Sequence, residues 1–113
     1  MKEKPLADMQ KEIVRVFKEY EKTGTHKWTA DIAAKDLSYQ LGSLTKRMMQ
    51  LKGERYADGL NKKELKKFVA DELADILAEV LFISHELGID IQEAWGGMIG
   101  SDKKKISSRS KKS

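Results

Sequence analysis

The chain has 113 residues, no cysteine and a formal net charge of +4. This length supports one domain with a modest core, and the lack of cysteine excludes disulfides, thiolate metal sites and a cysteine nucleophile. No apolar run approaches the roughly 20 residues that span a bilayer, and the start MKEKPLADMQKEIVRVF lacks a signal-peptide core. We therefore expect a cytoplasmic protein with no membrane partner.

The positive charge is concentrated at one end of the chain. Residues 103–113, KKKISSRSKKS, contain five lysines, one arginine and no acid. Removing these six basic residues from the 22 in the chain leaves 16 against 18 acids, so residues 1–102 carry a charge of −2. We therefore predict a helical domain over 1–102 and a disordered basic tail over 103–113, which has too little apolar surface to fold alone. Such a tail is also suited to weak electrostatic contact with polyanions.

Two helices are predicted in the first half of the chain, over residues 5–22 and 29–52. Pro5 suits the start of the first helix, Gly24 follows its end, and Thr29 is an N-cap for the second helix. Apolar residues follow the helical period in both segments: Leu6, Met9, Ile13, Val16, Phe17 and Tyr20 in the first, and Leu37, Leu41, Leu44, Met48 and Leu51 in the second.

Two further helices are predicted over residues 62–87 and 90–99. The third has an apolar stripe and stops at Gly88, and Asp90 begins the fourth with Glu93 as its capping-box partner. Three glycines then weaken the fourth helix before the tail. The stripe of the third helix consists of Leu73, Ile76, Val80, Ile83 and Leu87. No segment alternates with period two, so no strand is predicted.

These elements predict an all-α fold in which the helices form a four-helix unit. Two long and two short helices bury limited area on their own. We expect the apolar sides of the first and third helices to complete their burial against another copy of the chain. The predicted assembly is therefore a homo-oligomeric helical bundle, either a dimer or a tetramer.

A row of carboxylates runs beside the stripe of the third helix, at Glu72, Asp75, Glu79 and Glu86. On a helical wheel, Glu72 and Glu79 fall at the border of the apolar face, where like charges repel unless a cation lies among them. Oxygen ligands at spacings of three and four suit Mg²⁺, with Mn²⁺ as a substitute. The alternative is a solvated acidic edge that pairs with basic residues of the second helix, such as Lys46.

The segments that carry the acids resemble a known family. ELADILAEVLFISHELGIDIQEA (72–94) is similar to the C-terminal half of the MazG-like, all-α nucleoside triphosphate pyrophosphohydrolases, with Glu-x-x-Asp on a helix and LGID before a short final helix. WTADIAAKDLSYQLGSLTKRMMQLKG (28–53) is similar to the preceding family helix, including Gly42 in its middle. The resemblance covers about residues 5–102.

This resemblance implies Mg²⁺-dependent cleavage of a nucleoside triphosphate to the monophosphate and pyrophosphate. Four acids would hold the metal, and Glu72 and Asp75 stand at the second pair, where the resemblance makes them catalytic. At the first pair this chain has Gln40 and Ser43, so the site lacks two formal negative charges. Glu79, one turn after Asp75, is a candidate replacement, as is Asp36, one turn before Gln40.

Trp28 and Lys46 are the candidate substrate-binding residues, since Trp28 lies where aromatic residues of the resembling enzymes stack on a base. Packing in the core is the alternative role for Trp28. His26 and His85 lack partners at ligand spacing and are interpreted as surface residues. Two functions remain open: an attenuated nucleotide pyrophosphohydrolase, or a non-catalytic helical oligomer that binds nucleotide or a protein partner.

Overall fold

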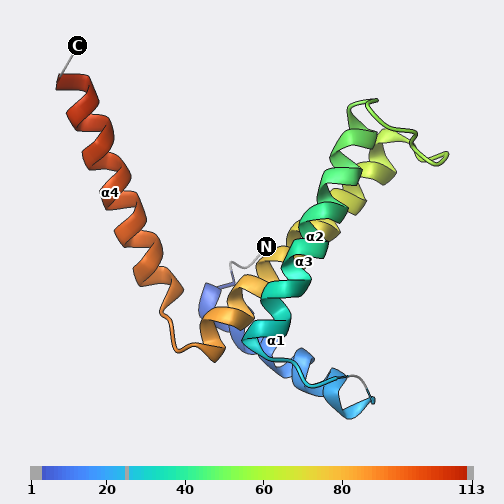
Figure 1. Ribbon diagram of the computed structural model, residues 1–113, viewed down its shortest axis with the longest axis horizontal. Coiled ribbons are helices and arrows are strands. Elements are labelled where there is room, and N and C mark those ends of the chain that lie inside the picture. Colours follow the sequence, from blue (N-terminus) through green and yellow to red (C-terminus); the bar gives the residue numbers. More distant parts are fainter. Residues whose placement is uncertain (1–3, 25, 112–113) are drawn as a thin grey trace.

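Four α-helices account for most of the computed structural model, which describes residues 4–24 and 26–111 (Figure 1). They are α1 (Leu6–Lys22), α2 (Ala30–Leu51), α3 (Lys62–Glu86) and α4 (Ile91–Lys111). No strand occurs within the described ranges, so the all-helical prediction is confirmed. None of the described helices combines the length and apolarity needed to cross a membrane.

The helix starts follow local side-chain signals. Thr29 caps α2, because its hydroxyl accepts a hydrogen bond of 3.1 Å from the backbone N–H of Ile32. At α3, Asn61 and Glu64 form a reciprocal capping box, which the sequence analysis did not identify. Gly88 follows the end of α3 with a φ of +65°, a left-handed conformation that favours glycine.

Helix α3 is the central element, and α2 packs antiparallel along it (Figure 1). Ser43 of α2 donates a 3.0 Å hydrogen bond to Glu72 of α3. One turn further along α2, the guanidinium of Arg47 lies 4.1 Å above the ring centroid of Phe68, which is one turn earlier in α3. These two contacts set the register between the helices, and they bring position 43 next to Glu72.

Helix α1 packs against the C-terminal half of α3 and closes the core. The Phe17 ring stacks on Trp28 at a centroid distance of 4.4 Å and lies 4.7 Å from Phe82 of α3. Gln10 fixes the other end of α1, since its amide donates to the backbone oxygen of Leu81 and to the hydroxyl of Ser84, both at 2.9 Å. The buried cluster consists of Val14, Phe17, Ala33 and Phe82.

The buried face of α3 differs from its predicted apolar stripe. Leu73 is 52% exposed and Leu87 is 60% exposed, whereas the carboxylate-bearing Glu79 is only 3% exposed. The cause is the position of α1, which crosses α3 beside Leu81 and Phe82 and so covers the side of α3 next to Glu79. A helical wheel of α3 alone contains no information about this crossing.

Helix α4 is longer than predicted, since it continues to Lys111 instead of ending near residue 99. The segment from Lys103 to Lys111, predicted as the start of a disordered tail, is therefore helical. Gly96, Gly97 and Gly100 do not break it, and none of them has a positive φ. Arg109 lies in the last turn of α4, where a cation interacts favourably with the helix dipole. Figure 1 also shows α4 (orange to red) pointing away from α1, α2 and α3, so the described residues of one chain do not form the predicted four-helix packing.

Candidate functional site

An acidic and aromatic pocket lies where α1, α2 and α3 meet. Its volume is about 340 Å³. The aromatic side chains come from α1 and from the segment before α2, and the carboxylates come from α2 and α3. The lining residues are Ile13, Val16, Phe17, Tyr20, Trp28, Asp36, Gln40, Asp75, Ala78 and Glu79.

Glu79 is the most unusual residue of this pocket. Its side chain is buried, and neither carboxylate oxygen accepts a hydrogen bond from a donor among the described residues. Burial is the largest cause of a pKa raised to about 8, followed by a side-chain hydrogen bond with Asp36, the charge of Asp36 and then the charge of Asp75. When protonated, Glu79 therefore shares its proton with the Asp36 carboxylate. When ionised, it is buried without a donor, which is costly, so it is then suited to a ligand that supplies positive charge.

Asp75 stands one turn before Glu79 at the more exposed rim of the pocket. Its pKa is also raised, first by burial of the carboxyl group and then by the charges of Glu72, Asp71 and Asp36. Asp75 and these neighbouring acids therefore repel one another in the absence of a cation.

The residues that replace the first acid pair face the second pair, as the resemblance implies. Gln40 lines the pocket together with Asp75, and its amide donates a long, 3.4 Å hydrogen bond to Asp36. The Ser43 hydroxyl donates to one oxygen of Glu72, whereas the other Glu72 oxygen is buried without a partner among the described residues. Ser43 therefore uses one of the two Glu72 oxygens. A metal-binding residue at position 43 would leave that oxygen available to a metal ion.

The two predicted substrate-binding residues have different surroundings. Trp28 is half-buried, lines the pocket and packs against Phe17, so it takes the alternative role of core packing while it also borders the pocket. Lys46 is exposed on α2 and does not line this pocket. His26 and His85 are both exposed, in agreement with their interpretation as surface residues.

Gly42 has open space around it. A Cβ atom built at this position would meet no atom within 4 Å, apart from those of the glycine's own local backbone and its chain neighbours. Close packing between helices of one chain therefore does not explain a glycine in the middle of α2, where it costs about 1 kcal/mol relative to alanine.

Two aromatic residues of the pocket were not predicted as site residues from the sequence. Phe17 and Tyr20 of α1 belonged to the predicted apolar face of the first helix, which is the usual meaning of aromatic residues at helical spacing. Their place beside the acids depends on how α1 crosses α3. No local signal in the sequence reports that crossing.

The donor set is suited to a divalent cation shared with a substrate. No three acidic or histidine side chains in the described part of the chain converge to hold a metal ion alone. Mg²⁺ nevertheless requires only one or two carboxylates when water and phosphate oxygens complete its shell. The buried oxygens of Glu79 are hard ligands of the type that Mg²⁺ prefers, whereas Glu72 lies seven residues earlier on α3, about 10 Å along the helix axis, and does not line this pocket.

Comparisons of the chain with models of protein families, with curated proteins and with solved structures gave no match. The similarity to MazG-like enzymes therefore rests on the sequence segments 28–53 and 72–94.

Proposed function

We propose that this chain is a MazG-like nucleotide pyrophosphohydrolase, attenuated by the loss of two acids, which cleaves a (d)NTP to the monophosphate and pyrophosphate. The observation that carries this proposal is the buried carboxyl group of Glu79, which lies beside Asp36 and accepts from no donor among the described residues, in a pocket that also contains aromatic side chains. One side of such a pocket suits a base and the other side suits a cation that accompanies phosphates.

Each part of the pocket has a role in this proposal. Trp28 and Tyr20 offer aromatic surface to the base. Asp75 and Glu79 would hold Mg²⁺ or Mn²⁺, with Glu72 and Asp36 as neighbouring acids and the Gln40 amide oxygen as a neutral ligand. When bound, the ion supplies charge neutralisation of the triphosphate and a lower pKa for the attacking water. Because two acids of the family set are replaced, we expect weaker ion binding than in a four-acid site.

A non-catalytic role is the second candidate, and the Ser43–Glu72 hydrogen bond favours it. That bond uses a carboxylate oxygen that the family pattern would offer to a metal. In this alternative, the chain keeps the helical fold and binds nucleotide or a protein partner without hydrolysis.

Pyrophosphate release and thermal shift, measured together, distinguish the two functions. The full chain is incubated with a panel of dNTPs in Mg²⁺ or Mn²⁺, and the variants are Asp75→Asn, Glu79→Gln and, as a matched control on an exposed part of α3, Glu86→Gln. The enzyme proposal expects release by the parent and the control but not by the other two variants. A thermal shift without release supports the nucleotide-binding role. Neither signal with any nucleotide refutes both hydrolysis and nucleotide binding and leaves the protein partner as the second candidate.

The proposal also includes the localisation of the protein, its self-association and its contact with polyanions. We place it in the cytoplasm as a homo-oligomer, a dimer or a tetramer, which the exposed apolar residues Val16 and Leu77 on α1 and α3 support. The basic half of α4 supports weak contact with polyanions, because lysines neutralise phosphates and release their counterions.

A further inference from the structure

Helix α4 requires a covering surface that its own chain does not provide. It has 21 residues, three of them glycine, and points away from the other helices (Figure 1). Each glycine weakens a helix by about 1 kcal/mol relative to alanine, and helices without tertiary contacts are marginal in water. Trp95 is 63% exposed and Ile106 is 66% exposed, so the apolar side of the helix lacks cover.

The apolar residues of α4 form one stripe, and the glycines occupy the opposite side. At 100° per residue, Ile91, Trp95, Met98, Ile99 and Ile106 share one face, whereas Gly96, Gly97 and Gly100 lie across the helix axis. Beyond Ile99, Lys103 and Lys105 border this stripe on its two sides, whereas Lys104 lies on the glycine side. The stripe is therefore apolar from Ile91 to Ile99 and is flanked by lysines next to Ile106.

A groove between α1 and α3 has the matching order. Its apolar section, about 380 Å³, is lined by Lys4, Met9, Glu12, Ile13, Val16, Leu77, Ala78 and Leu81. Three of these residues, Ile13, Val16 and Ala78, also line the acidic pocket, so the two sections are continuous. Along the direction of α1, the groove is apolar near Met9 and acidic near Tyr20, where Asp75 and Glu79 lie.

The lengths of the two surfaces agree. Eight residues separate Trp95 from Lys103 and ten separate it from Lys105, which is about 12–15 Å along a helix axis. Eleven residues separate Met9 from Tyr20, which is about 16 Å. A helix whose apolar face fills the first section therefore places its lysines at the acidic end.

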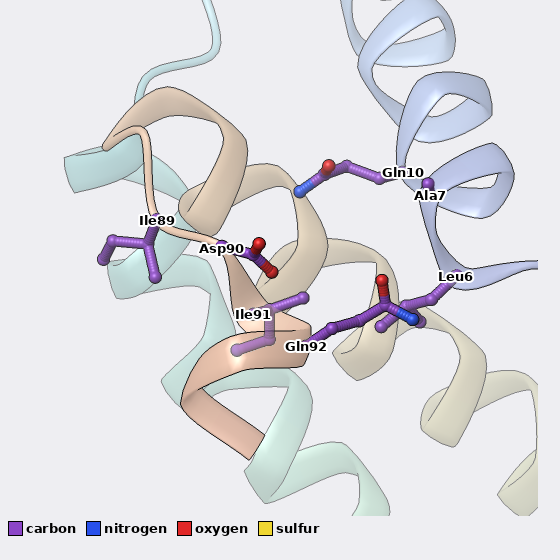
Figure 2. Close-up of a pocket in the computed structure, with 7 residues that line it drawn as sticks. All are labelled: Leu6, Ala7, Gln10, Ile89, Asp90, Ile91 and Gln92. Carbon is purple, nitrogen blue, oxygen red and sulfur yellow. The ribbon is translucent and has the colours of Figure 1, made fainter. Parts of the chain in front are cut away.

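The linker to α4 keeps this helix away from the groove of its own chain. The Ile89 N–H donates to the Ser84 carbonyl oxygen at 2.8 Å, and the Asp90 carboxylate accepts from the Glu93 N–H at 3.1 Å. Figure 2 shows Ile89 and Asp90 across a pocket of about 220 Å³ from Gln10 of α1. The Asp90–Glu93 bond caps α4 and moves with it, whereas the Ile89–Ser84 bond ties the linker to α3. Folding α4 back onto its own groove would have to break the Ile89–Ser84 bond, and a second copy can supply its α4 without breaking it.

We infer that α4 of a second copy lies in the groove between α1 and α3, with its apolar stripe on Val16 and Leu77 and its lysines at the acidic end. The exchange is reciprocal, so a two-fold dimer closes with both grooves filled. This inference rests on the self-association included in the proposed function and is independent of hydrolysis. It specifies the two surfaces that form the dimer interface. It also places lysines of the second copy near the carboxylates of the candidate site.

Disulfide trapping tests this arrangement directly, because the natural chain has no cysteine. One full-length chain carries Leu77→Cys and a tag that changes its size. It is mixed with a chain that carries Trp95→Cys or Met98→Cys, or with the matched control Gly100→Cys on the opposite face of α4. We expect the apolar-face variants to form the mixed disulfide at least several-fold faster than the control, and we expect 1 M salt to slow this reaction, because the Debye length is then only about 3 Å.

Light scattering of the parent separates the ways in which the inference can fail. An oligomer in which all three α4 variants cross-link at the same rate, or none does, overturns the docking of α4 but leaves self-association intact. A monomer at tens of micromolar overturns both. If the double variant Leu77→Cys/Met98→Cys closes only within one chain, α4 folds back onto its own groove and the exchange is wrong.

Discussion

Replacing Glu79 by glutamine is expected to stabilise the protein at high pH and to remove the part of its pH dependence that Glu79 causes. The pKa of Glu79 is raised from 4.5 to about 8 in the folded state. The folded protein therefore binds more protons than the unfolded chain, and stability is lost as pH rises from the unfolded pKa through the folded one. With 1.36 kcal/mol per pKa unit, the loss between pH 5 and pH 8 is about 3 kcal/mol.

Urea unfolding followed by circular dichroism at pH 5 and pH 8 measures this effect. At pH 5 the parent and Glu79→Gln should have similar free energies of unfolding, and at pH 8 the variant should be more stable by roughly 2–3 kcal/mol. Glu86→Gln, an exposed change seven residues further along α3, should leave the parent's pH dependence unchanged. Equal pH dependence in the parent and Glu79→Gln would show that Glu79 ionises without cost, and the argument from its burial would then be wrong.

Four further outcomes are expected. Gly42→Ala should raise the free energy of unfolding by about 1 kcal/mol in urea, because the site is open; a loss of self-association instead would indicate that a partner approaches there. Replacing Gln40 and Ser43 together by glutamate should lower the melting temperature of the ion-free protein through carboxylate repulsion, and Mg²⁺ should restore it; no Mg²⁺ effect beyond that in the parent would refute a shared ion site. Phe17→Ala should destabilise the protein by about 3–5 kcal/mol in urea unfolding, since this ring lies in the buried cluster. Deleting residues 103–113 should weaken binding to single-stranded DNA and reduce the slope of log affinity against log salt; an unchanged slope would exclude a polyanion contact by this segment.

The sequence predicted what depends on nearby residues. Thr29 as an N-cap and Gly88 as a helix stop need only the adjacent backbone, and both occur as expected. The positions of Gln40 and Ser43 opposite the acids of α3 followed from the alignment of two helices.

Features that depend on tertiary packing were not predicted from the sequence. The burial of Glu79 arises where α1 crosses α3, and the exposure of Leu73 arises because no residue in the described ranges covers that side. The length of α4 was underestimated because three glycines lower helix propensity without forbidding the helical conformation. Its detachment from the other helices is likewise a tertiary property that periodicity does not report.

The two tryptophans of the chain occupy contrasting environments, and this gives the protein two built-in optical reporters. Trp28 packs against Phe17 at the edge of the candidate pocket, whereas Trp95 lies 63% exposed on α4. In a Trp28→Phe variant the remaining emission comes from Trp95 and reads only whether α4 is covered by another surface. In a Trp95→Phe variant it comes from Trp28 and reports what enters the pocket, whether a ligand or the partner's α4. Quenching by iodide therefore follows assembly through Trp95, and a ligand effect is a change at Trp28 that Trp95 does not share.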